Sequence, residues 1–248
     1  MRNLAAELKH SETAFVLPLT DKAYQIRYFT SVGEVELCGH ATISLFTVLR
    51  ECCGIKPGTY LADTLAGPLN IDVRETEVWM DMAAPKSIYE FNEDESRLLY
   101  EAFATDFSFD PENLQPQIIS TGLRDILLPV RTREQLEQMK IDTDLVNRIS
   151  KEYDVIGVHA FSLGDGSVTA YCRNYAPLYG IEEEFATGTA NGALTFYLKQ
   201  QGYIQDGQVC TYIQGETMGR KSIIYASIDD CLVRVGGQAV ISVIGTSC

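Results

Sequence analysis

Two segments that can form apolar helices lie within a long series of short strand-like segments, and they constrain the fold more than any other feature. Residues 40–52 and 187–201 are each long enough for roughly three or four helical turns, and both follow a cluster of small residues. In the first, apolar side chains lie on more than one face, which is typical of a buried helix. This pattern predicts a sheet wrapped around a central helix, and the arrangement occurs twice.

The strand-like segments alternate apolar with polar residues or form short apolar runs, separated by Gly, Pro, Asp and Asn. They comprise residues 14–17, 24–30, 78–82, 126–130, 155–161, 168–175, 209–213 and 223–228. Residues 1–7 read as an amphipathic helix and not as a signal peptide.

The two helical segments resemble each other. Placing Gly39 on Gly188 aligns Ala41 with Ala190, two leucines with two leucines, and a terminal Arg with a Lys. This similarity favours two pseudo-repeated halves, residues 1–112 and 113–248, with the junction near residue 112. Duplicated halves leave a cleft that is a common place for a ligand. The unpaired N–H groups at each helix start could hold an anion or a polarised carbonyl there.

Composition limits the partners of the chain. The net charge of −14 over 248 residues argues against nucleic acid or an anionic membrane surface as a partner. No apolar run approaches the roughly 20 residues that cross a bilayer, so we expect a cytoplasmic protein. The seven cysteines are scattered, without a CxxC pair or zinc-like Cys/His spacing, and predict reduced thiols and no metal site.

Several sequence blocks resemble one family in the right order. They are SETAFV (residues 11–16), RYFT (27–30), EVELCGHAT (34–42), RNYAP (173–177), GIEEEFATGTA (180–190), QGE (214–216), MGR (218–220) and VRVGG (233–237). In combination they resemble the PhzF-like (phenazine biosynthesis) family of the diaminopimelate epimerase-like superfamily over nearly the whole chain. The resemblance implies an α+β fold of two pseudo-repeated halves, each a mixed β-sheet curled around a central helix. It also implies a homodimer.

The same resemblance implies a reaction. The reference member moves a proton along a hydroxylated cyclohexadiene carboxylate in the cleft between its halves, without metal or organic cofactor. Carried over residue by residue, the catalytic residues are Glu12, His40 and Glu184. The substrate-binding residues at the same motifs are Ser11, Gly39, Ala41, Thr42, Thr187, Gly188 and Thr189. We therefore expect a cofactor-independent isomerase that acts on a small carboxylated metabolite.

The expected surroundings of Glu12 and His40 predict their protonation states. Burial in a cleft should raise the pKa of Glu12 toward the working pH, so that the carboxyl can both take and return a proton. A position near a helix N-terminus should favour the neutral form of His40. His10 and His159 lack such support and are expected to be structural.

The chain also departs from the family pattern. Glu184-Phe185 stands where the family has Asp-Pro, and the first half is expected to lack the family's first strand and GNP loop. These departures favour a catalytically impaired metabolite-binding or regulatory homologue as the alternative. A cysteine-type racemase or epimerase comes third, because Cys38 matches its first thiol whereas Phe185 is expected at the second. A metal hydrolase is least favoured.

Overall fold

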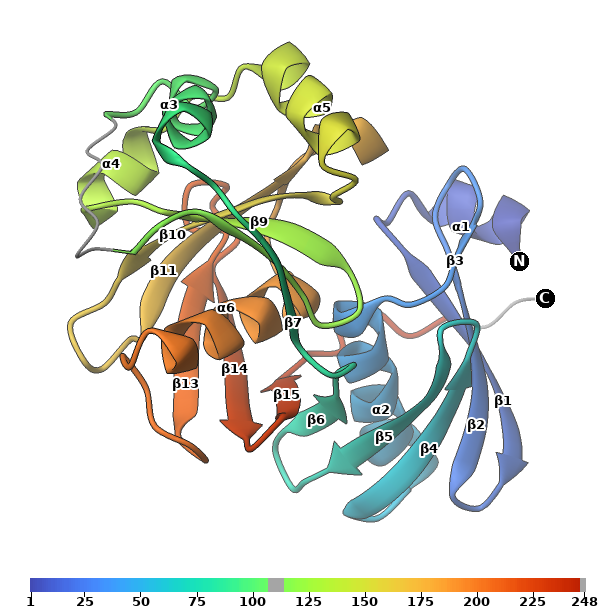
Figure 1. Ribbon diagram of the computed structural model, residues 1–248. Helices are drawn as coiled ribbons and strands as arrows, with labels where there is room; N and C mark the ends of the chain where they lie inside the picture. Colours follow the sequence, from blue (N-terminus) through green and yellow to red (C-terminus); the bar gives the residue numbers. More distant parts are fainter. Residues whose placement is uncertain (107–113, 246–248) are drawn as a thin grey trace. The chain divides into compact units, whose positions relative to one another are not determined.

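The computed structural model describes residues 1–106 and 114–245, and its internal contacts divide the chain into two compact units (Figure 1). Unit 1 comprises Met1–Asp81 with Gly236–Cys248, and unit 2 comprises Met82–Val235. The predicted junction near residue 112 lies outside the described residues, and the contacts place the division at residues 81 and 82 instead. None of the described helices is both long and apolar enough to span a membrane.

Unit 1 is a mixed sheet with one long helix packed on it. The strands follow the order β1-β2-β4-β5-β6, with β3 also paired to β2, and β2–β4 is the parallel pair. The elements are α1 (Arg2–Leu8), β1 (Thr13–Thr20), β2 (Ala23–Phe29), β3 (Glu34–Val35), α2 (Gly39–Cys53), β4 (Gly58–Thr64), β5 (Gly67–Val73) and β6 (Val78–Asp81). Helix α2 contacts β1, β5 and β6, which makes it the central helix of this unit.

The apolar faces of α2 explain its burial. Phe46 is fully buried and packs edge-on against Tyr24 of β2, with ring centroids 5.8 Å apart. Tyr60 of β4 lies 6.1 Å from the same ring. The helix ends at Gly54, whose φ of 72° is the left-handed C-cap conformation that glycine adopts without a steric penalty.

Unit 2 contains a larger mixed sheet. Its strand order is β15-β14-β13-β11-β10-β9-β8-β7, with β12 paired to β11, and the pairs β9–β10 and β11–β13 are parallel. The strands are β7 (Lys86–Glu90), β8 (Gln117–Ser120), β9 (Arg124–Pro129), β10 (Gly157–Leu163), β11 (Ala170–Ala176), β12 (Ile181–Glu184), β13 (Val209–Gln214), β14 (Ser222–Asp229) and β15 (Leu232–Gly237). The last two residues of β15 belong to unit 1.

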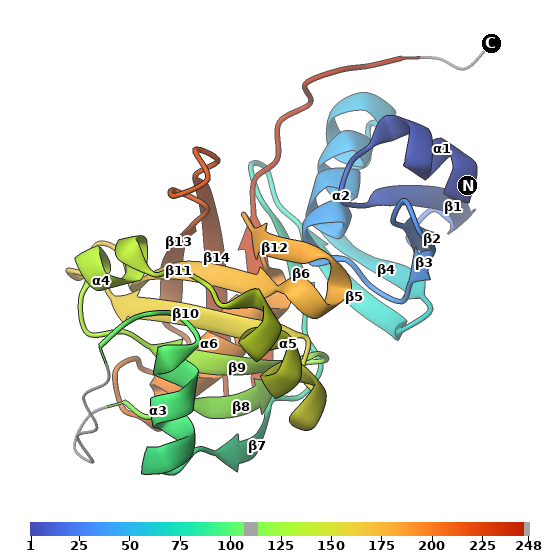
Figure 2. The ribbon, with the colours of Figure 1, turned by 90° about the horizontal axis from the view of Figure 1, so that it is seen from above.

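Helices cover both faces of this sheet (Figures 1 and 2). One face packs against α6 (Gly188–Gln200), and the other against α3 (Glu93–Glu101), α4 (Arg133–Gln138) and α5 (Thr143–Glu152). Along β10, Val158 and Ala160 belong to the core under α3–α5, whereas Phe161 packs on Tyr197 of α6 at 5.9 Å. Strands buried on both faces read as continuous apolar runs, as the sequence of β9 does.

The position of β7 and α3 explains the corrected boundary. Strand β7 pairs with β8, and Leu99 of α3 lies in one core cluster with Ile118 of β8 and Val158 of β10. The segment around residues 103–117 therefore joins two parts of one unit. Its prolines and polar residues indicate a connection, but a connection inside a domain carries the same sequence signal as a linker.

The predicted internal repeat matches the positions of the two central helices. Helices α2 and α6 begin at the aligned glycines, Gly39 and Gly188, and their N-cap residues are Cys38 and Thr187. Each contacts strands of its own unit. The predicted helices, residues 40–52 and 187–201, therefore begin within one residue of the observed starts.

Candidate active site

Three side chains with chemically active groups meet at the start of α2 in unit 1. Glu12 lies just before β1, Cys38 is the N-cap of α2, and His40 is its second residue. The Oε2 atom of Glu12 is 3.1 Å from Nε2 of His40, and the Cys38 Sγ atom is 3.6 Å from the same nitrogen. The Ser11 Oγ atom is 3.5 Å from it. The structure therefore brings predicted residues Ser11, Glu12 and His40 together.

A buried hydroxyl pair fixes this turn of α2. Tyr28 of β2 donates to Thr42 Oγ1 at 2.6 Å, and Thr42 donates to the Cys38 carbonyl at 2.7 Å. Both side chains are fully buried. The hydroxyl of Thr42, predicted to bind substrate, thus holds the helix start against β2. Ala41 beside it is also buried.

Glu12 and His40 stabilise each other's charged forms. Burial alone raises the pKa of Glu12, but the hydrogen bond and charge of His40, with smaller contributions from Ser11 and Cys38, outweigh burial and lower it. Burial alone lowers the pKa of His40, but its contacts with Cys38 and Glu12 raise that pKa well above its usual range. The expected directions for both residues were wrong: burial is the largest single effect on each pKa, but the contacts of each residue together outweigh it, with His40 contributing most for Glu12 and Cys38 most for His40. At neutral pH the pair is a carboxylate and an imidazolium.

In unit 2, one buried glutamine, Gln214, forms hydrogen bonds to the segment before α6 and to its first turn. The Nε2 atom of Gln214 donates to the Glu184 carbonyl at 2.7 Å and to Thr187 Oγ1 at 3.0 Å. Its Oε1 atom accepts from the Thr187 N–H at 3.3 Å and from Asn191 Nδ2 at 2.9 Å. The residues between β12 and α6 are therefore held from β13. Gln214 belongs to the QGE block, whose sequence alone does not indicate this role.

The run of three glutamates separates into different environments. Glu183 forms a bidentate ion pair with Arg173, at 2.9 and 2.8 Å, and both side chains are nearly buried. Glu182 is exposed. Glu184 accepts a hydrogen bond from the N–H of Phe185 at 3.1 Å. Glu183 therefore has a structural role in the ion pair with Arg173.

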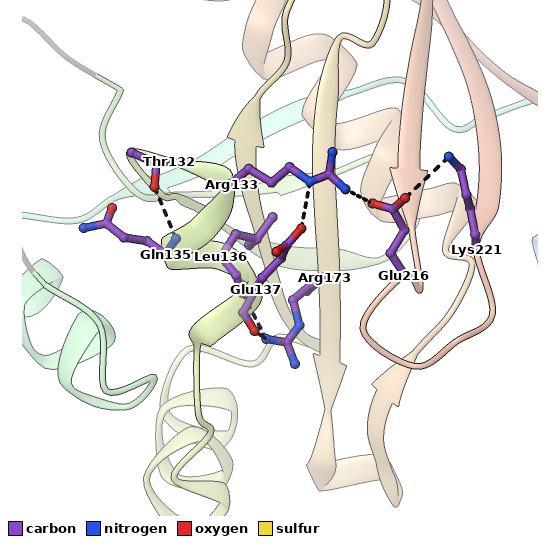
Figure 3. A network of polar contacts seen from close by, with 8 residues as sticks. All are labelled: Thr132, Arg133, Gln135, Leu136, Glu137, Arg173, Glu216 and Lys221. Atoms are coloured by element: carbon purple, nitrogen blue, oxygen red, sulfur yellow. Dashed lines mark hydrogen bonds and ion pairs between the residues drawn. The ribbon is translucent and has the colours of Figure 1, made fainter.

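Arg173 also connects β11 to α4 (Figure 3). Its Nη1 atom donates to the carbonyls of Leu136 and Met139 at 3.0 and 3.1 Å. Next to it, Arg133 pairs with Glu137 at 2.8 Å and with Glu216 at 2.8 Å. This network ties α4 to β11 and to Glu216, which follows β13.

Phe185 makes a contact that proline could not make. The Arg220 guanidinium lies over its ring, 3.6 Å from the centroid. A cation over an aromatic face is attracted by the ring quadrupole. The departure from Asp-Pro to Glu-Phe is therefore accompanied by a stacked arginine from the MGR block.

Both central helices begin without a side-chain cap within the described residues. The N–H groups of a first helical turn have no carbonyl partner inside the helix, and the sequence predicts backbone donors at these two helix starts. Thr189 is buried, and its carbonyl accepts from Thr121 at 2.9 Å. Substrate contacts of all seven residues remain predictions: Ser11, Gly39, Ala41, Thr42, Thr187, Gly188 and Thr189.

Comparison with known proteins identifies the family. The sequence profile described as "Phenazine biosynthesis-like protein" (PhzC-PhzF) matches residues 1–245. The chain belongs to this family.

Curated relatives of this PhzF-family chain carry the names of isomerases. It is 28% identical to an uncharacterized isomerase of Clostridium acetobutylicum, over 97% of this chain and 85% of that protein. It is 34% identical to an uncharacterized isomerase of Deinococcus radiodurans, over 82% of this chain and 67% of that protein. The prediction of an isomerase is confirmed at the level of the reaction class.

Solved structures confirm the predicted fold. The PhzF-family protein of Bacillus anthracis superimposes with a TM-score of 0.84 at 26% identity, over 96% of this chain and 85% of that one. A hydroxyproline epimerase of Agrobacterium vitis superimposes with a TM-score of 0.58 at 12% identity, over 92% and 71% of the two chains. The second similarity shows the shared epimerase-like fold alone.

The structure sharpens the argument against a two-cysteine mechanism in this family member. The residue of α6 that matches Cys38 at the N-cap of α2 is Thr187, and not Phe185 as predicted, because both helices begin at the aligned glycines. The thiol of Cys172 lies 3.5 Å from Asn191 of α6, but it is buried, and burial raises its pKa. A neutral buried thiol is a poor base.

Proposed function

We propose that this chain is a cofactor-independent isomerase that moves a proton between carbon atoms of a small carboxylated metabolite. The ion pair of Glu12 and His40 carries the proposal. In the resting protein its 3.1 Å separation keeps Glu12 ionised, so the carboxylate is available as a base. His40 supplies an N–H donor for a substrate oxygen that gains charge.

Substrate binding would make Glu12 a stronger base. When a substrate oxygen accepts the hydrogen bond of His40, Glu12 loses the partner that lowers its pKa. Its side chain is only 13% exposed, and burial then dominates and raises that pKa. Glu12 takes the proton from one carbon, holds it as a carboxylic acid, and returns it to another carbon. The N–H groups in the first turn of α2 are proposed to stabilise the developing negative charge.

Glu184 is proposed as a positioning or acid/base residue of the same reaction. Its backbone is held by Gln214, and this restraint supports a fixed role. The proposal for Glu184 rests on its place in the family motif.

A metabolite-binding homologue without catalysis is the second candidate. The observation that favours it is the Glu184 carboxylate turned back onto the N–H of Phe185, an arrangement that the longer side chain permits. Under this alternative a ligand binds, but no proton at carbon exchanges with solvent.

Glu12→Gln tests the proposal, with Glu75→Gln as the matched control at an exposed glutamate of the same unit. A hydroxylated cyclohexadiene carboxylate is the first compound to assay, followed by other small carboxylates. We expect Glu12→Gln to lower kcat by at least about a hundredfold while the ligand still binds, and Glu75→Gln to behave as the wild type. Equal kcat for wild type and Glu12→Gln would remove Glu12 from the mechanism.

A further inference from the structure

The cluster at the start of α2 contains three types of metal-binding atom. Ligand atoms of Glu12, Cys38 and His40 all lie within 4.8 Å of one another. Carboxylate oxygen, thiolate sulfur and imidazole nitrogen are the ligands that proteins use for Zn²⁺. The sequence showed no zinc-like spacing, because Glu12 precedes β1, whereas Cys38 and His40 are the N-cap and the second residue of α2.

The distances in this cluster suit a tetrahedral ion. With metal–ligand bonds of about 2.0–2.3 Å, neighbouring ligand atoms in a zinc site are roughly 3.3–3.6 Å apart. The oxygen of Glu12 lies 3.1 Å from Nε2 of His40, and the sulfur of Cys38 lies 3.6 Å from it. Small side-chain rotations would therefore bring all three atoms to one ion.

One buried oxygen supports a ligand role. The Oε2 atom of Glu12 is buried and lies 3.1 Å from Nε2 of His40, so a carboxylate oxygen and an imidazole nitrogen already face each other in the cluster. His40 is 28% exposed, so an ion has a route to the cluster from solvent.

The charges also balance. Cys38 would bind Zn²⁺ as a thiolate and His40 as a neutral imidazole, and any protons that binding displaces pass to solvent. The bound set of carboxylate, thiolate and neutral imidazole would carry two negative charges against the two positive charges of the ion. Three protein ligands leave a fourth position for water or a substrate oxygen.

We propose that Glu12, Cys38 and His40 form an inhibitory zinc site. The bound ion would block Glu12, the proposed base, and His40, the proposed hydrogen-bond donor. The inhibitory consequence rests on the proposed function. Binding of the ion itself does not, because it requires only the three ligand side chains.

Cobalt titration of the full-length, chelator-treated protein tests the site without any substrate. We expect one Co²⁺ per chain, with a thiolate-to-cobalt charge-transfer band that Zn²⁺ abolishes by displacement. Cys38→Ser should remove the band, and Glu12→Gln and His40→Gln should each weaken Co²⁺ binding by at least about tenfold. Far-UV circular dichroism of each variant verifies that the fold is retained.

The exposed pair Cys52 and Cys53 provides the matched control. Cys52→Ser/Cys53→Ser should keep the band and the affinity of the wild type. A band that survives Cys38→Ser, or that disappears in Cys52→Ser/Cys53→Ser, would show that surface thiols hold the metal and would overturn the site. Once a substrate is known, full turnover with Zn²⁺ bound at Cys38 would overturn the inhibitory role. The cobalt titration uses no substrate, so its result holds even if the isomerase proposal fails.

Discussion

At the scale of single residues, the contacts within the cluster of Glu12, Cys38 and His40 decide the charge states of Glu12 and His40. Sequence motifs located both side chains, because the SETAF and GHAT blocks mark them. Their charge states could not be obtained in this way. The contacts among Glu12, Cys38 and His40 depend on how β1 and α2 pack, and together they reverse the pKa direction that burial alone would give to Glu12 and His40.

The ion pair predicts a broad pH optimum. Activity requires ionised Glu12 and protonated His40, and their pKa values are shifted apart, below and above their usual ranges. We expect kcat to be constant through neutral pH, to fall in acid as Glu12 gains a proton, and to fall in base as His40 loses one. In His40→Gln, burial should dominate and move the acid limb to higher pH. If that variant is inactive, ¹³C NMR of labelled glutamate follows Glu12 directly, and an unchanged Glu12 pKa would contradict the ion pair.

A second buried carboxyl gives a stability prediction. Asp125 of β9 is 1% exposed, its Oδ1 atom has no hydrogen-bond partner in the described part of the chain, and burial raises its pKa to about 7. Because the folded-state pKa is raised, the contribution of Asp125 to stability is complete below about pH 4 and is lost as the pH rises through 7.

Asp125→Asn removes this dependence. The free energy of unfolding of the variant, relative to wild type, should increase from pH 4 to pH 8 by up to about 4 kcal/mol. Urea denaturation at several pH values measures the difference. A difference that does not change with pH would show that Asp125 does not titrate in the folded chain.

At the scale of elements, the strongest sequence predictions were those with a clear period or an internal repeat. The starts of α2 and α6 were predicted because aligned glycines mark both helices. Helices α3 and α5 were not predicted, although Asn92 and Asp142 cap them. Their apolar residues are spaced among many charged ones, and capping alone did not distinguish them from loops.

Gln214 is the clearest positioning residue at this scale. Gln214→Ala removes four hydrogen bonds at 2.7–3.3 Å around the start of α6 and leaves buried partners unsatisfied. We expect a loss of about 2–3 kcal/mol in the free energy of unfolding. Gln201→Ala, at an exposed position beyond the other end of α6, is the control and should cost less than about 0.5 kcal/mol. Equal effects of the two substitutions would contradict the positioning role.

At the scale of the whole molecule, the resemblance predicted the fold and the family, and the repeat predicted two halves. The boundary between the two units could not be predicted from the sequence, because it depends on which strands pair with each other. Only the pairing of β7 with β8, and the core that contains Leu99 of α3, assign residues 82–106 to unit 2.

This assignment predicts which fragments fold. Residues 82–235 form one continuous unit with its own core, and should unfold cooperatively when expressed alone. Residues 113–248 lack β7 and α3, and should not fold. Circular dichroism and thermal denaturation compare the two fragments, and a folded 113–248 with an unfolded 82–235 would restore the boundary near residue 112.

Deuterium incorporation tests the central claim most directly. The wild-type chain and Glu12→Gln are incubated in D₂O with the hydroxylated cyclohexadiene carboxylate and with related small carboxylates, and NMR follows deuterium at each carbon. Proton transfer by Glu12 predicts that wild type isomerises one of these compounds with deuterium at the carbon that gains the proton, and that Glu12→Gln does neither. Isomerisation with the same deuterium incorporation in Glu12→Gln would contradict it.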